Sequence, residues 1–374
     1  MKKSIFTFLT VLALTVFSSC LLSADPVKIG LMAPITGAWA AEGEDMVRVV
    51  EILVQELNDS GGINGEQVVL EKADDGGEPK NAALAAQMLI TSGVVAVVGT
   101  YGSTVTEATQ DLYDEAGIVQ VATGSTSIRL TDKGLPLFFR TCPRDDEQGR
   151  VLANEVIKLG YKKVAIVHDN SAYAKGLADE ARKTFQTGGV EEVYYDAITP
   201  GDRDFNASLT AIQTASPDII VFTGYFPEAG LILRQKREMN WDIPIIGGDA
   251  TNNTALVEIA GNQAADGYYF VSPPALADMN TPAAAKLMET YKAKFDGAVP
   301  SSVWSVLAGD AFEVIVEAVK AVGPDPVAMA TWLKTDFKDY QGFSGPIAFD
   351  DKGDRIGEVY RLYKVDANGQ FVLQ

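Results

Sequence analysis

The sequence predicts an α/β fold with two lobes of similar size. Short apolar runs alternate with amphipathic helices from Val27 onward, a pattern typical of βαβ units with largely parallel strands. The pattern restarts after residues 138–143, and a chain of 374 residues is long enough for two domains. The helices expected after Pro282 come without interleaved strands, so they should pack on the existing sheets and not form a third domain.

The first lobe is expected to begin with strands that are short apolar runs, each ending at turn residues. These strands are predicted at residues 27–32, 68–72, 94–99 and 118–122. A helix over residues 44–58 follows from an apolar stripe that includes Met46, Val50 and Leu53. Further helices are predicted at residues 79–91 and from Ser103 onward, and residues 33–43 are typical of a loop.

The second lobe is expected to repeat this alternation. Its strands are predicted near residues 164–167, 193–197, 219–223, 245–247 and 267–271. Its helices are predicted at residues 146–159, 172–186, 205–214 and 228–239. The helices that lack intervening strands are predicted at residues 282–295, 303–322 and 326–334. The closing segment 345–373 is typical of antiparallel strands, because Asp-Lys-Gly-Asp and Asn-Gly turns interrupt it.

The amino terminus has the pattern of a secretory signal. Lys2 and Lys3 precede an apolar run, and small residues follow it, so residues 1–24 are expected to be a signal peptide. Two cleavage schemes remain open. Residues 17–20 resemble a bacterial lipobox, which would make Cys20 the lipidated first residue, whereas cleavage after Ala24 would remove Cys20. Either scheme places the mature protein on the extracytoplasmic side, with a lipid anchor at Cys20 as its only expected membrane attachment.

Composition argues against nucleic acid as a partner and against an internal disulfide in the mature chain. Removing Lys2 and Lys3 with the signal leaves 29 basic residues against 50 acidic ones, a poor surface for nucleic acid. Cys142 is then left without a cysteine partner in the mature chain, so no internal disulfide is expected and a buried, inert thiol is predicted.

The sequence offers little for catalysis. Its single histidine, His168, ends a predicted strand, and no Gly-x-Ser-x-Gly motif surrounds a serine. With one histidine and two cysteines a zinc site is not expected. Walker A and Gly-x-Gly-x-x-Gly motifs are absent, so neither an enzyme activity nor a cofactor is expected.

Two polar turns of the first lobe form the candidate binding site. One follows the predicted strand that ends at Gly99 and includes Ser103, and the other is Gly124-Ser125-Thr126. Both follow strands of a parallel sheet, where open α/β sheets bind their ligands. Their hydroxyls and backbone N–H groups, with a helix beginning at Ser103, favour an anion such as a carboxylate.

Residues at strand ends of the second lobe complement these turns. Tyr173, Tyr225 and Asp249 each follow a predicted strand. A carboxylate held by the first lobe, opposite an ammonium paired with Asp249, would be recognition of an α-amino acid. Each residue has a structural alternative: Ser103 as a helix cap, the tyrosines as core residues and Asp249 as a turn residue.

Several motifs resemble the leucine/isoleucine/valine-binding proteins, the extracytoplasmic receptors of branched-chain amino-acid ABC importers. These are VKIGLMAPITG at residues 27–37, SGGING at 60–65, residues 74–80, VAIVHD at 164–169 and GYFPE at 224–228. The resemblance covers essentially the whole mature chain. It implies a type I periplasmic-binding fold, in which two doubly wound lobes are joined by a hinge of three crossings.

The resemblance also implies how the chain is divided. The crossings are expected near residues 140–143, 271–274 and 344–349. Lobe 1 would then comprise residues 25–141 and 274–345, and lobe 2 residues 142–273 and 346–374.

By the same resemblance, Ser103 and the turn from Gly124 through Ser125 to Thr126 would hold the ligand's head group. Asp249 would pair with the ammonium, and Tyr173 and Tyr225 would cover the ligand from the second lobe.

The expected side-chain pocket departs from the family pattern. Glu42 stands where many members have an aromatic residue, Trp39 precedes it by three residues, and Tyr101 replaces a smaller aliphatic residue. We therefore expect a monomeric receptor that delivers a free amino acid to an inner-membrane ABC permease. A branched-chain or other neutral amino acid is the first expectation, and an aromatic, polar or cationic one is the alternative. Two alternative hypotheses are a receptor for an amide, urea or an aromatic acid, and a ligand-sensing module of a signalling system.

Overall fold

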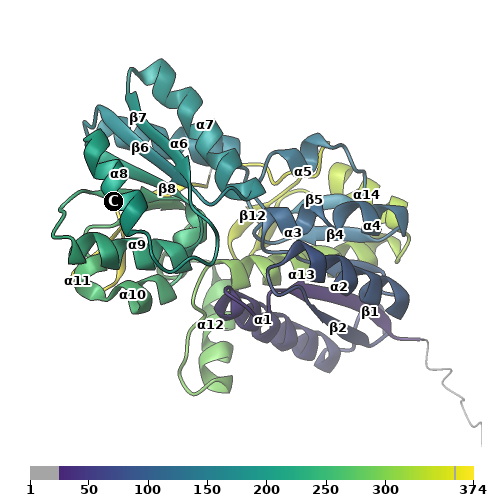
Figure 1. Ribbon diagram of the computed structural model, residues 1–374. Coiled ribbons are helices and arrows are strands. Elements are labelled where there is room, and N and C mark those ends of the chain that lie inside the picture. Colours follow the sequence, from purple (N-terminus) through teal and green to yellow (C-terminus); the bar gives the residue numbers. More distant parts are fainter. Residues whose placement is uncertain (1–24, 358) are drawn as a thin grey trace, which may run out of the picture.

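The computed structural model describes residues 25–357 and 359–374 and has two α/β lobes lying side by side (Figure 1). The predicted signal peptide and Cys20 lie outside the described residues. Within the described part of the chain, no helix is long and apolar enough to cross a membrane. Cys142 is buried with a free thiol, in agreement with the sequence.

The first lobe is built on a five-stranded parallel sheet with the strand order β2-β1-β3-β4-β5. Its strands are β1 (Val27–Ala33), β2 (Val68–Asp74), β3 (Ala96–Val98), β4 (Val119–Ala122) and β5 (Phe138–Arg140). Its helices are α1 (Ala40–Asp59), α2 (Pro79–Ser92), α3 (Ser103–Glu107), α4 (Gln110–Glu115), α5 (Arg129–Asp132), α12 (Pro282–Lys294), α13 (Trp304–Val322) and α14 (Pro326–Thr335). The late helices α12 and α13 pack on α1, as expected from the absence of strands between them.

The second lobe contains a seven-stranded sheet with the order β14-β13-β10-β9-β8-β6-β7. Its strands are β6 (Lys163–His168), β7 (Glu191–Ala197), β8 (Ile219–Thr223), β9 (Ile245–Gly247), β10 (Tyr269–Ser272), β13 (Arg361–Val365) and β14 (Phe371–Leu373). Its helices are α6 (Asp145–Lys158), α7 (Ala172–Gly188), α8 (Asn206–Ala215), α9 (Phe226–Glu238), α10 (Ala255–Ala260) and α11 (Asn262–Ala265), with a short 3-10 turn, η1 (Asp249–Thr251). The sheet is parallel from β7 to β10, and β13 and β14 add antiparallel strands at one edge.

The central strands of each sheet are buried on both faces, which explains why they are continuous apolar runs, whereas the edge strands β2 and β7 are partly exposed. In β1, Ile29 and Leu31 pack toward α1 and α13, whereas Met32 packs toward α2. In β6, Ile166 packs toward α6 and α7, whereas Val167 packs toward α8 and α9. Successive side chains of a strand point to opposite faces, so each lobe has two half-cores.

Several elements differ from the sequence prediction, among them β5, which was not expected as a strand. Helix α1 begins at Ala40, four residues before the expected start, so Glu42 lies in its first turn and not in a loop. Gly43 permits this start, because a β-carbon there would lie 2.1 Å from the Pro34 carbonyl oxygen. The helix at Ser103 ends after five residues, so its dipole is weaker than that of a long helix. Helices α10 and α11 were not anticipated, since each is shorter than two turns.

The chain passes between the sheets three times: after β5, after β10, and between β12 (Gly345–Ile347) and β13. The short hairpin of β11 (Tyr340–Gly342) and β12 stays with the first lobe. Phe349 also stays there, since its ring packs against Phe139 and Phe337. The third crossing therefore lies beyond Phe349, later than the expected segment 344–349 and than a second lobe resuming at residue 346.

Candidate functional site

The candidate site lies at the points where the strand order of each sheet reverses. In the first lobe the chain runs from β1 outward to β2 and returns to β3, so the segments after β1 and β3 flank a crevice. Trp39 and Glu42 follow β1, and Tyr101 and Ser103 follow β3. In the second lobe the reversal lies between β6 and β8, which are followed by Tyr173 and Tyr225. Both crevices open at the carboxyl ends of the strands.

Hydrogen bonds hold the two polar turns of the first lobe together. The Ser127 N–H donates to the Ser103 hydroxyl over 3.2 Å. The Ser125 hydroxyl lies 2.6 Å from that of Thr106 and 3.1 Å from the carbonyl oxygens of Thr100 and Tyr101, so it is engaged inside the lobe. The Gly124 N–H also faces inward, toward the Thr100 carbonyl. The Thr126 hydroxyl, in contrast, is buried without a partner in the described chain.

Aromatic side chains from both lobes form one cluster, in which Tyr101, Tyr225 and Trp304 are buried and Trp39 is half-buried. The rings of Trp39 and Tyr225 lie across the lobe boundary with their centroids 4.1 Å apart. Tyr101 packs edge-on against both, and Trp304, at the start of α13, packs against Tyr101 with centroids 5.9 Å apart. The Tyr101 hydroxyl and the Trp304 indole N–H have no hydrogen-bond partner in the described chain. The cluster is thus apolar in its body and carries two unused polar atoms.

Asp249 is buried at the start of η1 and is surrounded by hydrogen-bond donors. The Tyr360 hydroxyl donates to it over 2.8 Å, and Gln148 donates to the Tyr360 oxygen over 2.9 Å. Tyr173 lies in the same group, where its hydroxyl accepts from the Ala250 N–H over 3.3 Å. Burial raises the pKa of Asp249 to about 7, although the hydrogen bonds from Tyr360, Tyr173 and Gln148 oppose this.

Glu42 is fully buried, and its carboxylate bridges the lobes. The Asn253 side-chain N–H donates to Glu42 over 2.6 Å, and the Ser302 hydroxyl donates to its other oxygen. Burial raises the pKa of Glu42 to about 8, with the hydrogen bonds from Asn253 and Ser302 acting in the opposite direction.

Further hydrogen bonds hold the lobes in contact. The Ala172 N–H of α7 donates to the Thr104 hydroxyl of α3 over 3.0 Å. The Thr254 N–H donates to the Ser301 carbonyl over 3.1 Å. Together with the Trp39 and Tyr225 rings, these contacts describe a closed arrangement in which the site residues are shielded from water.

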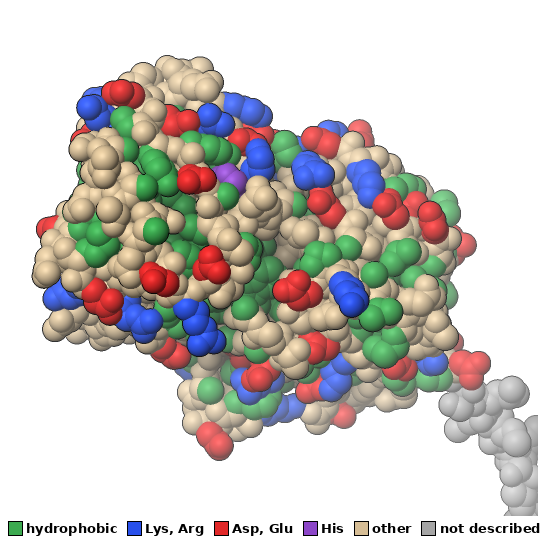
Figure 2. Space-filling model, viewed as in Figure 1, with side chains coloured by type: hydrophobic (Ala, Val, Ile, Leu, Met, Phe, Trp, Pro, Cys, Tyr) green, Lys and Arg blue, Asp and Glu red, His purple; other side chains and the backbone are tan. Residues whose placement is uncertain are grey.

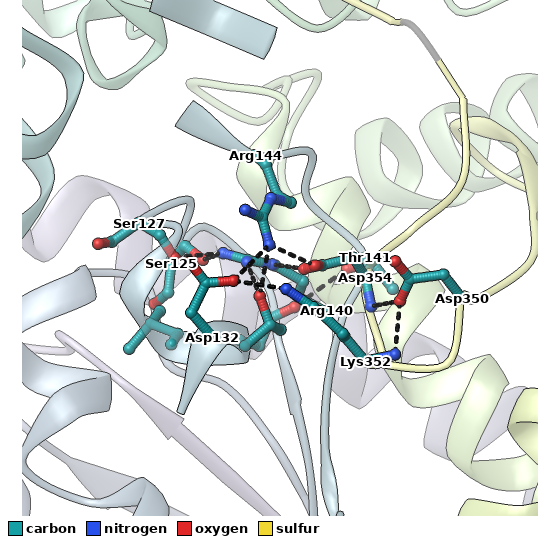
Figure 3. A network of polar contacts seen from close by, with 12 residues as sticks. Ser125, Ser127, Asp132, Arg140, Thr141, Arg144, Asp350, Lys352 and Asp354 are labelled. Atoms are coloured by element: carbon teal, nitrogen blue, oxygen red, sulfur yellow. Dashed lines mark hydrogen bonds and ion pairs between the residues drawn. The ribbon is translucent and has the colours of Figure 1, made fainter. Parts of the chain in front are cut away.

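An ionic network beside the site joins the first and third crossings (Figure 3). The buried Arg140 guanidinium pairs with Asp354 and donates to the carbonyl oxygens of Ser125 and Ser127 over 2.9 and 2.8 Å. Arg144 binds the other Asp354 oxygen over 2.7 Å. One guanidinium thus connects the hinge to the turn that forms one wall of the candidate site.

The ten residues that the sequence singled out for ligand binding lie on segments that follow β1, β3, β4, β6, β8 and β9, but sequence reasoning missed several neighbours. The missed residues are Asp145, Gln148, Asn253, Ser302, Trp304 and Tyr360. Asp145 could have been identified from the sequence, because it follows the first crossing at the start of a helix. Tyr360 could not, because its position depends on the third crossing, which was expected too early in the chain.

The described residues contain no cluster of histidine, cysteine or carboxylate ligands able to hold a metal ion. His168 is buried, and its Nδ1 accepts the Asn170 N–H over 3.0 Å. Burial raises the pKa of the Cys142 thiol well above its ordinary value. On the face shown in Figure 2, acidic and basic side chains are interspersed.

Two doubly wound lobes that close over a buried group of polar and aromatic side chains are the architecture of type I periplasmic binding proteins. Comparisons with known proteins agree with it. A model of the family described as periplasmic binding protein matches residues 26–370. The Leu/Ile/Val-binding protein BraC3 of Rhizobium johnstonii is 39% identical over 345 residues, which are 91% of this chain and 92% of that protein.

Solved structures show the same likeness. The branched-chain amino-acid transporter substrate-binding protein LivJ of Streptococcus pneumoniae, in complex with isoleucine, is 31% identical. It has a TM-score of 0.85, with 94% of this chain and all of that chain covered. A solute-binding protein of an ABC transporter from R. palustris, in complex with benzoate, has a TM-score of 0.83 at 24% identity, over 93% of this chain and 95% of that chain, and shows the fold alone. The chain belongs to the periplasmic binding protein family and, within it, to the Leu/Ile/Val-binding proteins of ABC transporters.

Proposed function

We propose that this protein is an extracytoplasmic receptor that captures a free α-amino acid and delivers it to an ABC permease in the inner membrane. The observation that carries the proposal is the convergence at the two switch points. Ser103 and Thr126 of the first lobe, and Tyr173, Tyr225 and Asp249 of the second, are all buried and all follow the carboxyl ends of strands. Hydroxyls and N–H groups suit a carboxylate, and a buried acid suits an ammonium.

The side-chain end of the site favours a neutral amino acid. The Glu42 carboxylate already accepts hydrogen bonds from Asn253 and Ser302, neutral groups that take the place a cationic side chain would need. Trp39, Tyr101, Tyr225 and Trp304 surround this end with aromatic carbon. A branched-chain or other neutral side chain of moderate size would be desolvated there on closure.

The proposal includes a role in binding and not in catalysis. His168 is held by a backbone hydrogen bond, and Cys142 is buried as a thiol, so neither is presented as a nucleophile or base. A monomer that alternates between open and closed lobes would present its closed surface to the permease.

A ligand screen tests the proposed function. Protein freed of prebound ligand by unfolding and refolding would be scanned for thermal shifts with the twenty amino acids, urea, short amides and benzoate. We expect neutral amino acids to raise Tm by several degrees, because a ligand that binds only the folded state stabilises it. A shift with urea, amides or benzoate and none with any amino acid would instead establish the rival receptor function.

A further inference from the structure

Asp145 is the acidic residue of the site whose role the fold leaves unexplained. It is the first residue of α6, directly after the first crossing, and it has no exposed surface. Neither of its carboxylate oxygens has a hydrogen-bond partner in the described chain. An ionised carboxylate in such a position is costly unless something binds it.

Asp145 faces the candidate site. A β-carbon added to Gly176 of α7 would lie 4.0 Å from Asp145 Oδ2 and 3.9 Å from Ser127 Oγ, so these two atoms flank the same point. The Ser127 and Thr126 hydroxyls are also buried without partners in the described chain. Burial, and then the charge of Asp249, raises the pKa of Asp145 well above its ordinary value, whereas the neighbouring Thr126 hydroxyl and then the charge of Arg140 lower it.

Asp249, unlike Asp145, has hydrogen-bond donors around its carboxylate. It receives a hydrogen bond from Tyr360, and Tyr173 and Gln148 also favour its ionised form. The Arg140 guanidinium does not donate a hydrogen bond to Asp145, because its N–H groups donate to Asp354, to the carbonyls of Ser125 and Ser127, and to Thr131. The acid of the site whose carboxylate oxygens lack hydrogen-bond partners in the described chain is therefore Asp145, beside the unpartnered hydroxyls of Thr126 and Ser127.

We propose that Asp145 is a ligand-binding residue that accepts hydrogen bonds from the ammonium of the bound amino acid and shares that ammonium with Asp249. The inference rests on the proposed amino-acid receptor function and sharpens its substrate class. Two carboxylates against one head group require a cationic nitrogen with several N–H donors. Ligands without one, such as benzoate, urea or an amide, would bring no positive charge to these two buried acids.

The test compares Asp145→Asn with the wild type and with a matched control, Asp146→Asn. Asp146 is the next residue of the same helix, but its side chain is 49% exposed and pairs with Arg144. Each protein would be stripped of ligand and titrated calorimetrically with the amino acid that gives the wild type its largest thermal shift. Asp145→Asn should lower the affinity at least tenfold, and Asp146→Asn should change it less than twofold.

The stability of the ligand-free protein separates binding from a structural role. Asn is nearly isosteric and uncharged, so Asp145→Asn should leave the ligand-free Tm unchanged or raise it, because an unpaired buried acid is removed. An affinity within twofold of the wild type, or a lower ligand-free Tm that accompanies the loss of affinity, would overturn the role of Asp145 and leave the receptor function intact. A wild type that responds to no amino acid would refute the receptor function itself, and the inference with it.

A second titration uses L-leucine and 4-methylpentanoate, which is leucine without its amino group. If the wild type prefers leucine, Asp145→Asn should reduce that preference at least tenfold, and an unchanged preference would contradict the inference. If leucine is not the ligand, the preferred amino acid and its des-amino analogue take the place of this pair.

Discussion

At the scale of single residues, the contact between Glu42 and Asn253 is one of those that stabilise the closed arrangement of the lobes. It is a buried hydrogen bond between α1 of the first lobe and the segment before α10 of the second, 211 residues apart in sequence. A hydrogen bond that exists only in the closed form stabilises that form alone. Opening exposes both groups to water, so the net gain is about 1 kcal/mol, typical of a protein hydrogen bond.

Removing either partner should therefore weaken ligand binding through the closed form. Glu42→Ala and Asn253→Ala should each lower affinity about three- to tenfold, and the double variant should lose little more than either single one. The double-mutant cycle is needed because Asn253 also accepts the Ala255 N–H at the start of α10. Calorimetry measures the affinities, and Glu44→Ala, an exposed neighbour paired with Arg48, is the control. Fully additive losses would show that the two residues act independently.

The same scale shows the limit of sequence reasoning. Trp39, Tyr101, Tyr173 and Tyr225 follow strands that an apolar run identifies, so their shared location could be inferred. Whether a polar atom is already satisfied could not. The hydroxyl of Ser125 is used inside its own lobe and that of Thr126 is not, although the two residues are adjacent and chemically alike. Such a difference depends on side-chain orientation, which no spacing pattern encodes.

At the scale of elements, the first crossing is bonded both to the binding turn and to the third crossing. Arg140 ends β5, and its guanidinium fixes the turn after β4 and Asp354 on the third crossing. A buried ion pair contributes little net stability compared with apolar packing, but breaking one partner leaves a buried charge and costs about 3–5 kcal/mol. Here the binding turn would also lose the hydrogen bonds that Arg140 donates to the carbonyl oxygens of Ser125 and Ser127.

Arg140→Lys should therefore lower both stability and affinity. A lysine keeps the charge but cannot reach Asp354, two carbonyls and Thr131 at once, because it lacks the planar fork of arginine. We expect a loss of about 3 kcal/mol in the free energy of unfolding and at least a tenfold loss in affinity. Denaturant unfolding and calorimetry measure the two quantities. Lys133→Ala, which breaks an exposed pair with Asp111, should change stability by less than about 1 kcal/mol.

A destabilised Arg140→Lys protein with wild-type affinity would show that the turn is held by other contacts. Elements such as this crossing were only partly predictable. The strands and long helices follow from apolar periodicity, whereas the expected third crossing at residues 344–349 rests on the family resemblance and lies too early, since Phe349 still packs on the first lobe.

At the scale of the whole molecule, buried acids set the response to pH. Burial raises the pKa of Glu42 to about 8, of Asp75, Asp249 and Glu313 to about 7, and of Asp169 to about 6. In the unfolded chain these groups titrate near pH 4. Between about pH 4.5 and 8 the folded protein therefore binds more protons than the unfolded chain, and its stability falls as the pH rises. Repulsion between the many acidic residues also lowers the stability of the folded protein as the pH rises.

The ligand-free protein should accordingly melt at a higher temperature at pH 5.5 than at pH 8, by about 5 °C or more. Acids with lowered pKa values, such as Asp354 paired with Arg140 and Arg144, lose their stabilising effect only at lower pH. Scanning calorimetry at constant ionic strength measures the profile. Asp249→Asn should flatten it, since one of the titrating groups is removed. A Tm that rises from pH 5.5 to 8 would contradict the buried-acid explanation.

The position of Cys142 gives the molecule an internal reporter of its own motion. The residue lies on the first crossing, two positions after Arg140, and its thiol is buried and held protonated by its surroundings. A maleimide or iodoacetamide can reach it only when the crossing is transiently exposed. Alkylation kinetics on the unmodified protein would therefore record how often the hinge opens. A bound ligand would be detected as slower alkylation of Cys142.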